Sequence, residues 1–256
     1  MRLGIQGRNA LVTGVSRRAG IGFAIARRLL EAGANVFVQG WTPHDAARPW
    51  GAEAGGTEAV AEELGVGFAE ADFADPEAPG RVVTAAAEAV GPLDILVVNH
   101  ARSGHGRLAE LTAAELDAFL HENVRASLLL VREFAARHDD SRPGGRVVLF
   151  SSGQHLAPMA REIAYAVSKG ALQQATLTLA DELAERGITV NAVNPGPTDT
   201  GWLEGRQPGS EMPFGRWGEP DDAARLVAWL CSDDARWITG QTIDSEGGFR
   251  RWSPPQ

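Results

Sequence analysis

Short apolar runs alternate along the chain with longer segments in which alanine and leucine recur at helical spacing. Each apolar run is unbroken and contains β-branched residues, which is typical of a strand buried on both faces of a sheet. Seven strands are predicted, at Ala10–Thr13, Val36–Gln39, Val66–Glu70, Ile95–Val98, Val147–Phe150, Thr189–Val193 and Gln241–Asp244.

The segments between these strands have the length and periodicity of helices. Helices are predicted at Ile21–Ala32, Thr57–Leu64, Arg81–Val90, Ala113–His138, Ala164–Arg186 and Asp221–Ser232. Thr112 and Glu115 form a capping box in front of the fourth helix. Strand–helix alternation predicts an α/β protein with a doubly wound Rossmann fold. We expect residues 1–256 to form a single domain, in which a seven-stranded parallel sheet has helices on both faces.

Two long segments carry no regular pattern, Trp41–Gly56 after the second strand and Thr198–Met212 after the sixth. In a doubly wound sheet, ligands bind at the carboxyl ends of the strands, where both segments begin. We therefore expect residues of about 41–56 and 198–212 to form lids over a binding site.

Composition narrows the function classes. The 256 residues carry a formal net charge of −9 without a basic run, which argues against binding to nucleic acid. A lone Cys231 excludes an intramolecular disulfide, and no cysteine–histidine cluster indicates a metal site. Residues Met1–Asn9 lack an apolar signal core, and no apolar stretch approaches the ~20 residues that span a bilayer. A cytoplasmic protein without membrane or metal partners is predicted.

A glycine-rich loop follows the first strand and runs directly into the first helix, as Thr13-Gly14-Val15-Ser16-Arg17-Arg18-Ala19-Gly20-Ile21-Gly22. Glycines let the backbone approach a pyrophosphate, whose charge is favoured at a helix N-terminus. Because the loop opens a strand–helix–strand unit, a dinucleotide site is preferred over a plain tight connection. Its predicted contacts are Gly14, Ser16, Arg17, Arg18, Gly20, Ile21 and Gly22.

The choice of cofactor depends on the end of the second strand, which reads Gln39-Gly40-Trp41 and lacks the carboxylate that would hold a ribose diol. Arg17 and Arg18 could instead bind a 2′-phosphate, because guanidinium groups match phosphate geometry. NADP(H) is therefore favoured. NAD(H) stays open, since Asp45 could reach the ribose and the arginines could be solvated. Trp41 either covers the adenine or packs the lid.

Tyr165 and Lys169 are four residues apart on a predicted helix and so share one face. A phenol titrates near ~10, so acid–base work near neutral pH requires a nearby cation that lowers its pKa. Lys169 is placed to supply that cation. The alternative is an ordinary amphipathic helix, because this spacing alone is common.

Together, the glycine loop, the strand order and the Tyr165/Lys169 pair resemble the short-chain dehydrogenase/reductase family over essentially the whole chain. The resemblance implies that Ser152, thirteen residues before Tyr165, binds the substrate carbonyl, and that Asn123 holds a water that links the lysine to solvent. Catalytic roles are thus expected for Ser152, Tyr165, Lys169 and Asn123. Further cofactor contacts implied by the family pattern are Asp72, Phe73, Asn99, Ala101, Pro195, Gly196, Thr198 and Thr200, with Tyr165 and Lys169 on the nicotinamide ribose.

Two departures from the family pattern stand out. Five residues instead of three separate Thr13-Gly14 from Gly20-Ile21-Gly22, so register does not tell which arginine faces the cofactor. The family's Asn-Asn-Ala-Gly is here Asn99-His100-Ala101-Arg102, which replaces a glycine by a cation. Arg102 could bind an anion or point to solvent, and His100 is expected to be a packed structural residue. Candidate substrate contacts are Arg102, Gln154, His155, Met159 and Trp202.

The predicted function is hydride transfer between NADP(H) and a ketone or secondary alcohol, with a pattern closest to 3-oxoacyl-[acyl-carrier-protein] reductases. Delivery of the substrate by an acidic carrier protein would need a basic patch, for which Arg142 and Arg186 are candidates, although both could instead be helix C-terminal cations. Alternatives are an NAD-dependent sugar or secondary-alcohol dehydrogenase, a dehydratase or epimerase, and a non-catalytic dinucleotide-binding regulator. Family members pair through their long helices, so a homotetramer or homodimer is expected.

Overall fold

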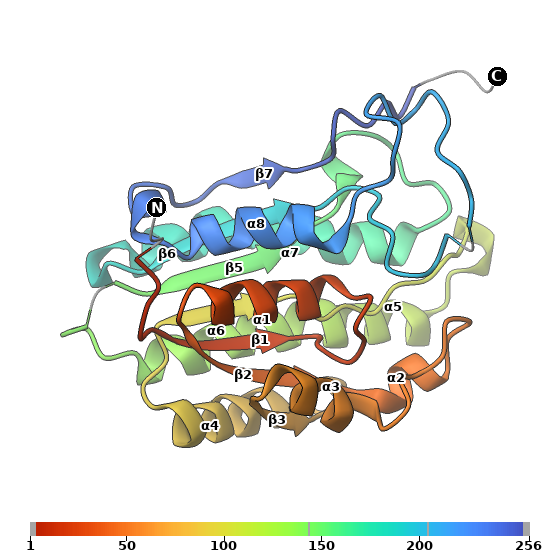
Figure 1. Cartoon of the computed structure of the whole chain (residues 1–256). Helices are drawn as coiled ribbons and strands as arrows, with labels where there is room; N and C mark the ends of the chain where they lie inside the picture. The colour runs from red at the N-terminus through yellow and green to blue at the C-terminus, as the bar shows by residue number, and fades with distance from the viewer. Residues whose placement is uncertain (1–3, 143, 204, 253–256) are drawn as a thin grey trace.

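The computed structural model describes residues 4–142, 144–203 and 205–252, and in these residues the chain forms a seven-stranded parallel sheet (Figure 1). The predicted doubly wound α/β fold is confirmed, and each predicted strand is present with its ends shifted by at most one residue. The strand order is β3-β2-β1-β4-β5-β6-β7. The strands are β1 (Asn9–Thr13), β2 (Asn35–Gly40), β3 (Gly67–Glu70), β4 (Ile95–Val98), β5 (Arg146–Phe150), β6 (Thr189–Asn194) and β7 (Thr242–Asp244).

Helices cover both faces of the sheet (Figure 1). Side chains alternate along each strand, so Ala10 and Val12 join one hydrophobic cluster and Leu11 the other. The first cluster includes residues of α1 (Ile21–Glu31), α3 (Gly56–Leu64) and α8 (Pro220–Leu230), and the second residues of α4 (Ala78–Val90), α6 (Ala126–Arg137) and α7 (Ile163–Leu183). Burial on both faces explains the apolar runs of the central strands, whereas the edge strands β3 and β7 are partly exposed.

The long helix predicted over Ala113–His138 is divided. It begins as α5 (Ala113–Phe119), where Thr112 Oγ1 accepts a hydrogen bond of 3.1 Å from Glu115 N, as the capping box predicts. A π-helical stretch, η2 (Leu120–Arg125), then leads into α6. Such π-turns in α-helices are frequent at functional sites.

The two predicted irregular segments differ from each other. Residues 41–56 contain a short helix, α2 (Thr42–Ala46), which the sequence pattern did not indicate. The described part of residues 198–212 has no helix or sheet strand, and residue 204 lies outside it. Short 3₁₀ turns complete the chain: η1 (Leu108–Glu110), η3 (Gly153–His155), η4 (Ala184–Arg186) and η5 (Asp233–Ala235).

The strand order reverses between β1 and β4, because β2 lies on one side of β1 and β4 on the other. Open α/β sheets bind ligands outside the carboxyl ends of the strands at such a switch point. The glycine loop after β1 and the loop after β4 both begin there. None of the helices in the described residues has the length and apolar character needed to cross a membrane.

Candidate active site

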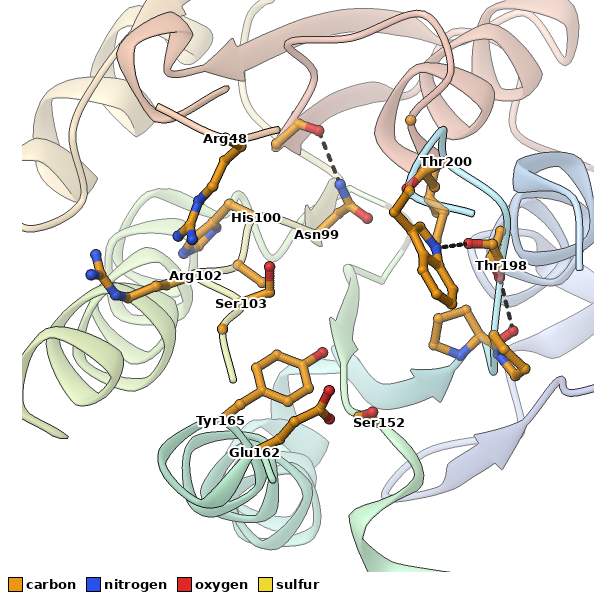
Figure 2. Close-up of a pocket in the computed structure, with 18 of the residues that line it drawn as sticks. Arg48, Asn99, His100, Arg102, Ser103, Ser152, Glu162, Tyr165, Thr198 and Thr200 are labelled. Carbon is orange, nitrogen blue, oxygen red and sulfur yellow. Dashed lines mark hydrogen bonds between the residues drawn. The ribbon is translucent and has the colours of Figure 1, made fainter. Parts of the chain in front are cut away.

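A cavity of about 1200 Å³ lies at the carboxyl ends of the strands (Figure 2). Its wall contains parts of the glycine loop, both irregular segments, the loop after β4 and the first turn of α7. Fifteen of the predicted cofactor contacts line it: Gly14, Ser16, Arg17, Gly20, Ile21, Trp41, Asp72, Phe73, Asn99, Ala101, Tyr165, Pro195, Gly196, Thr198 and Thr200. Arg18, Gly22 and Lys169 do not form part of the lining.

The glycine loop is shaped to accept an anion. Gly14 has a φ of +72°, and a Cβ on Gly22 would lie 2.4 Å from the Gly14 carbonyl oxygen, so both positions require glycine. Gly20 precedes α1 without a side-chain cap. The first-turn N–H groups of α1 therefore meet the cavity beside Gly20 and Ile21 and can receive a phosphate. These residues fit the pyrophosphate of a dinucleotide, with Gly22 packed behind the loop.

The two loop arginines point in different directions. Arg17 lies in the cavity wall, where its Nη1 donates to Thr200 O at 2.8 Å and its Nε lies 3.2 Å from Asp45 Oδ1. Arg18 binds Glu53 at 3.0 Å and also Glu63, both outside the cavity. Arg17 is therefore the loop cation placed to meet a bound cofactor, whereas Arg18 faces α3 and the first irregular segment.

Asp45 belongs to α2 and is 5% exposed. Its carboxylate accepts hydrogen bonds from Ser16 Oγ and, at 3.0 Å, from Trp50 Nε1, in addition to the ion pair with Arg17. The cation of Arg17 thus already has a carboxylate partner. The same carboxylate lies against the glycine loop, within reach of a ligand that contacts Ser16.

Ser152 and Tyr165 come together where β5 ends and α7 begins (Figure 2). Lys169 lies one turn further along α7. Burial raises the pKa of Tyr165 to about 12, and a hydrogen bond with Ser152 opposes that rise. Lys169 is 2% exposed, and its Nζ lies 5.8 Å from the centre of the Tyr165 ring. Lys169 Nζ donates to Phe150 O at 2.9 Å, and burial lowers the pKa of this amine to about 8.

The pKa of Tyr165 differs from the sequence-based expectation, in which Lys169 lowers it. Loss of hydration penalises the phenolate and outweighs the hydrogen bond from Ser152, so the net shift is upward. The phenol is protonated at neutral pH, as an unperturbed tyrosine also is, and the raised pKa makes it a weaker acid.

Asn123 lies in the π-helical stretch and is fully buried. Its Oδ1 accepts from Arg102 N at 2.6 Å, and its Nδ2 donates to Arg102 O and Ser168 Oγ, both at 2.9 Å. The side chain therefore ties the loop after β4 to α7, the helix that carries Tyr165. The expected role of Asn123 toward Lys169 stays a prediction.

Arg102 and His100 both lie in the loop after β4. Arg102 lines the cavity, with its Nη1 2.8 Å from Glu122 Oε1 and its guanidinium 5.5 Å from the centre of the Phe119 ring. The two ring nitrogens of His100 lie 2.9 Å from Thr13 Oγ1 and 3.1 Å from Glu122 O. Burial lowers the pKa of His100 to about 3, so the ring is neutral and serves to position the loop.

The predicted substrate contacts separate into two groups. Arg102, Met159 and Trp202 line the cavity, and Trp202 Nε1 donates to Thr198 O at 2.7 Å. Gln154 and His155 do not line it, because Gln154 binds Ser152 N and Gln173 while His155 Nε2 lies 3.2 Å from Asp244.

Sequence reasoning missed several other residues of the wall, namely Arg48, Trp50, Ser103, His105, Glu162, Glu246, Phe249, Arg251 and Trp252. Arg251 packs closely against Gly153, because a Cβ added to Gly153 would lie 2.1 Å from Arg251 Nη2. The Glu246–Trp252 segment follows the last strand at the carboxyl edge of the sheet, and this position alone could have predicted that the segment lines the cavity. The described residues contain no group of three or more His, Cys, Asp or Glu that could hold a metal ion.

Comparison with known proteins places this geometry in context. A family model described as enoyl-(acyl carrier protein) reductase matches residues 14–250. The uncharacterized oxidoreductase YjdA of Bacillus subtilis is 40% identical over 230 residues, which cover 88% of this chain and 90% of that protein. A short chain dehydrogenase from Burkholderia cenocepacia in complex with NADP is 37% identical, with a TM-score of 0.80 over 97% of this chain and 99% of that one. A blue fluorescent protein from a metagenomic library, in complex with NADPH, is 33% identical, with a TM-score of 0.83 over 96% and 99% of the two chains.

Proposed function

Because this chain belongs to the short-chain dehydrogenase/reductase family of NAD(P)-dependent oxidoreductases, we propose that it reduces a ketone to a secondary alcohol with NADPH. The observation that carries the proposal is one cavity with a glycine loop at one end and Ser152 beside Tyr165 at the other. The buried Lys169 completes this group from behind.

The side chains divide the chemistry between them. A nicotinamide held in this cavity would supply the hydride. Tyr165 donates its Oη proton to the carbonyl oxygen as negative charge develops there, and Ser152 fixes that oxygen by a hydrogen bond. The ammonium of Lys169 stabilises the phenolate that Tyr165 becomes. The raised pKa of Tyr165, about 12, keeps its proton in place at neutral pH but makes the phenol a weaker acid, so the stabilisation of the phenolate by Lys169 matters more.

The preference for NADPH is supported by Arg17 and by the NADP and NADPH complexes of the two structural relatives. Asp45 supports the alternative, in which a carboxylate receives the ribose diol of NADH, since it contacts both Ser16 and Arg17. NADPH is favoured, because the guanidinium of Arg17 can release Asp45 and bind a 2′-phosphate, which accepts two parallel hydrogen bonds from it.

Substitution of Arg17 tests this choice. Arg17→Ala is expected to raise the KM for NADPH by about 10- to 100-fold and to leave that for NADH within about threefold, because it removes one charge-assisted contact. Arg18→Ala is the matched control, since Arg18 binds Glu53 and Glu63 outside the cavity. Steady-state kinetics with both cofactors measures the effect. A wild-type preference for NADH, or equal effects of the two variants, would contradict the assignment.

A small ketone is a better substrate candidate than an acyl chain on a carrier protein. Arg142 makes two hydrogen bonds to the buried Asp94, at 2.7 and 2.6 Å. Arg186 binds Asp140 at 2.8 Å and donates to Ala135 O, near the C-terminus of α6, at 2.8 Å. Both cations therefore have partners, which weakens the case for a basic docking patch.

A panel of ketones and secondary alcohols tested with both cofactors examines the proposed function. Oxidation of NADPH that depends on a ketone would support it and exclude a non-catalytic regulator. Turnover restricted to alcohols with NAD would favour the alternative NAD-dependent sugar or secondary-alcohol dehydrogenase. A substrate converted without net change in the cofactor would indicate a dehydratase or epimerase.

We also propose a homotetramer in the cytoplasm. Val167 and Leu177 on α7 are 50% and 61% exposed, so this long helix presents apolar surface to a second copy. The lone Cys231 is buried, and burial raises the pKa of its thiol to about 12, so the thiol stays protonated. Size-exclusion chromatography with light scattering measures the assembly.

A further inference from the structure

Building on the proposed function, we propose that Glu162 is a specificity residue that selects ketones with a hydrogen-bond donor beside the reacting carbonyl and disfavours anionic ketones. Glu162 is the N-cap residue of α7, three positions before Tyr165. It lines the cavity, and its carboxylate points into the same space as the Tyr165 hydroxyl and Ser152 (Figure 2).

Two other carboxylates of the cavity wall, those of Glu246 and Glu122, are paired with arginines of the same wall. Glu246 binds Arg251 through both of its oxygens, one at 2.6 Å, and Glu122 Oε1 lies 2.8 Å from Arg102. Glu162 has no comparable cation at hand among the described residues: its ion-pair contact is His105 Nδ1 at 3.1 Å, on a side chain that is 83% exposed. A negative charge therefore faces the reacting groups with weak local compensation.

Such a carboxylate is unfavourable for the reaction itself. Negative charge develops on the carbonyl oxygen during reduction, and a like charge nearby opposes it. Glu162 also contributes to the raised pKa of Tyr165, which makes the phenol a weaker acid. We therefore expect the cost of the Glu162 carboxylate to the reaction to be offset by tighter binding of the substrate. A substrate hydroxyl or ammonium that donates to the carboxylate would supply that gain.

A purely structural role is the competing explanation. Gly106 N donates to Arg161 O at 2.6 Å, and residues 106 and 162 form an isolated β-bridge. The contact between His105 and Glu162 could therefore serve only to hold the loop after β4 against α7. In that case, loss of either partner would have the same consequence for every substrate.

The test compares three ketones of one carbon skeleton, butan-2-one, 1-hydroxybutan-2-one and 2-oxobutanoate, in the wild type and in Glu162→Gln. The variant is expected to lower kcat/KM for the hydroxyketone about tenfold relative to butan-2-one and to raise that for 2-oxobutanoate about tenfold, because it removes one charge without changing side-chain size. His105→Ala is the matched control. It removes the loop contact but keeps the carboxylate, so the preference for the hydroxyketone over 2-oxobutanoate should persist.

The outcomes separate this inference from the function on which it rests. A wild type that reduces ketones but prefers 2-oxobutanoate to the hydroxyketone overturns the inference and leaves the proposed function standing. The same is true if Glu162→Gln and His105→Ala change all three substrates alike. A wild type that reduces no ketone with either cofactor refutes the proposed function itself. NADPH binding and thermal melting confirm that both variants are folded.

Discussion

Replacement of Tyr165 by phenylalanine is expected to lower the turnover number at least about 10³-fold and to leave the Kd for NADPH within about fivefold. The substitution removes the Oη proton that the carbonyl oxygen must receive, a contribution typically worth about 10²- to 10⁴-fold. It keeps the aromatic ring, which contacts Phe119 edge-on at a centroid distance of 6.4 Å. Turnover and binding should therefore separate.

The measurement combines single-turnover kinetics with a fluorescence titration of NADPH. Ser152→Ala serves as the comparison, because it removes a hydrogen bond to the same carbonyl oxygen but no proton; a smaller loss, about 10- to 100-fold, is expected. A Tyr165→Phe variant that keeps more than a tenth of wild-type turnover would refute the role of Tyr165 as proton donor. The family assignment would remain, and a non-redox or binding function would become the better hypothesis.

The fold was predictable because its signals are local. Each central strand is buried on both faces, so it forms a short apolar run whose ends are visible in the sequence, whereas the edge strands β3 and β7 are partly exposed. Strand–helix alternation predicted the doubly wound sheet, and with it the carboxyl edge at which the glycine loop and both irregular segments begin. The places of these segments depend on the order of strands and helices and on the spacing between residues, and both can be read from the sequence.

The features that were not predictable depend on distant partners. Arg17 and Arg18 are neighbours with the same side chain, and their different directions follow from Asp45 on one side and from Glu53 and Glu63 on the other. The π-helical stretch that carries Asn123 was not predicted either, and the contacts that Asn123 makes there are with Arg102 and Ser168, which are distant in sequence.

The pKa of Tyr165 shows the same limit at the level of energetics. The spacing to Lys169 suggested a lowered value, since a nearby cation favours the phenolate. Packing around the first turn of α7 instead removes water from the phenol, and this penalty exceeds the opposing hydrogen bond from Ser152. Sequence spacing can bring two groups together, but the dielectric environment that decides their protonation arises from the assembled cavity wall.

Replacement of Lys169 by methionine is expected to damage both chemistry and cofactor binding. Turnover should fall at least about 10³-fold, because the phenolate formed on Tyr165 loses its cation. The Kd for NADPH should rise about tenfold or more if Lys169 also bonds the nicotinamide ribose. This double effect distinguishes the variant from Tyr165→Phe, in which binding persists.

The pH dependence follows from the same amine. Burial lowers the pKa of Lys169 to about 8, so the ammonium is present below that pH and is lost as the pH rises through it. Ketone reduction by the wild type should therefore decline above about pH 8. The residual activity of Lys169→Met should lack this decline, which a pH profile of kcat for both proteins measures.

Stability should change in the opposite direction to activity. The amine has a pKa of 10.5 when unperturbed and about 8 in the fold, so the folded state disfavours the ammonium, by about 3 kcal/mol at pH 7. The unfolded chain binds more protons between these two values, so this cost is complete below pH 8 and shrinks as the pH rises toward 10.5.

Methionine has no such cost and forgoes the hydrogen bond to Phe150 O, worth about 1 kcal/mol. Lys169→Met should thus melt at or above the wild-type temperature at pH 7, with a smaller difference at pH 9.5. A variant that melts well below the wild type would contradict the cost assigned to the buried ammonium.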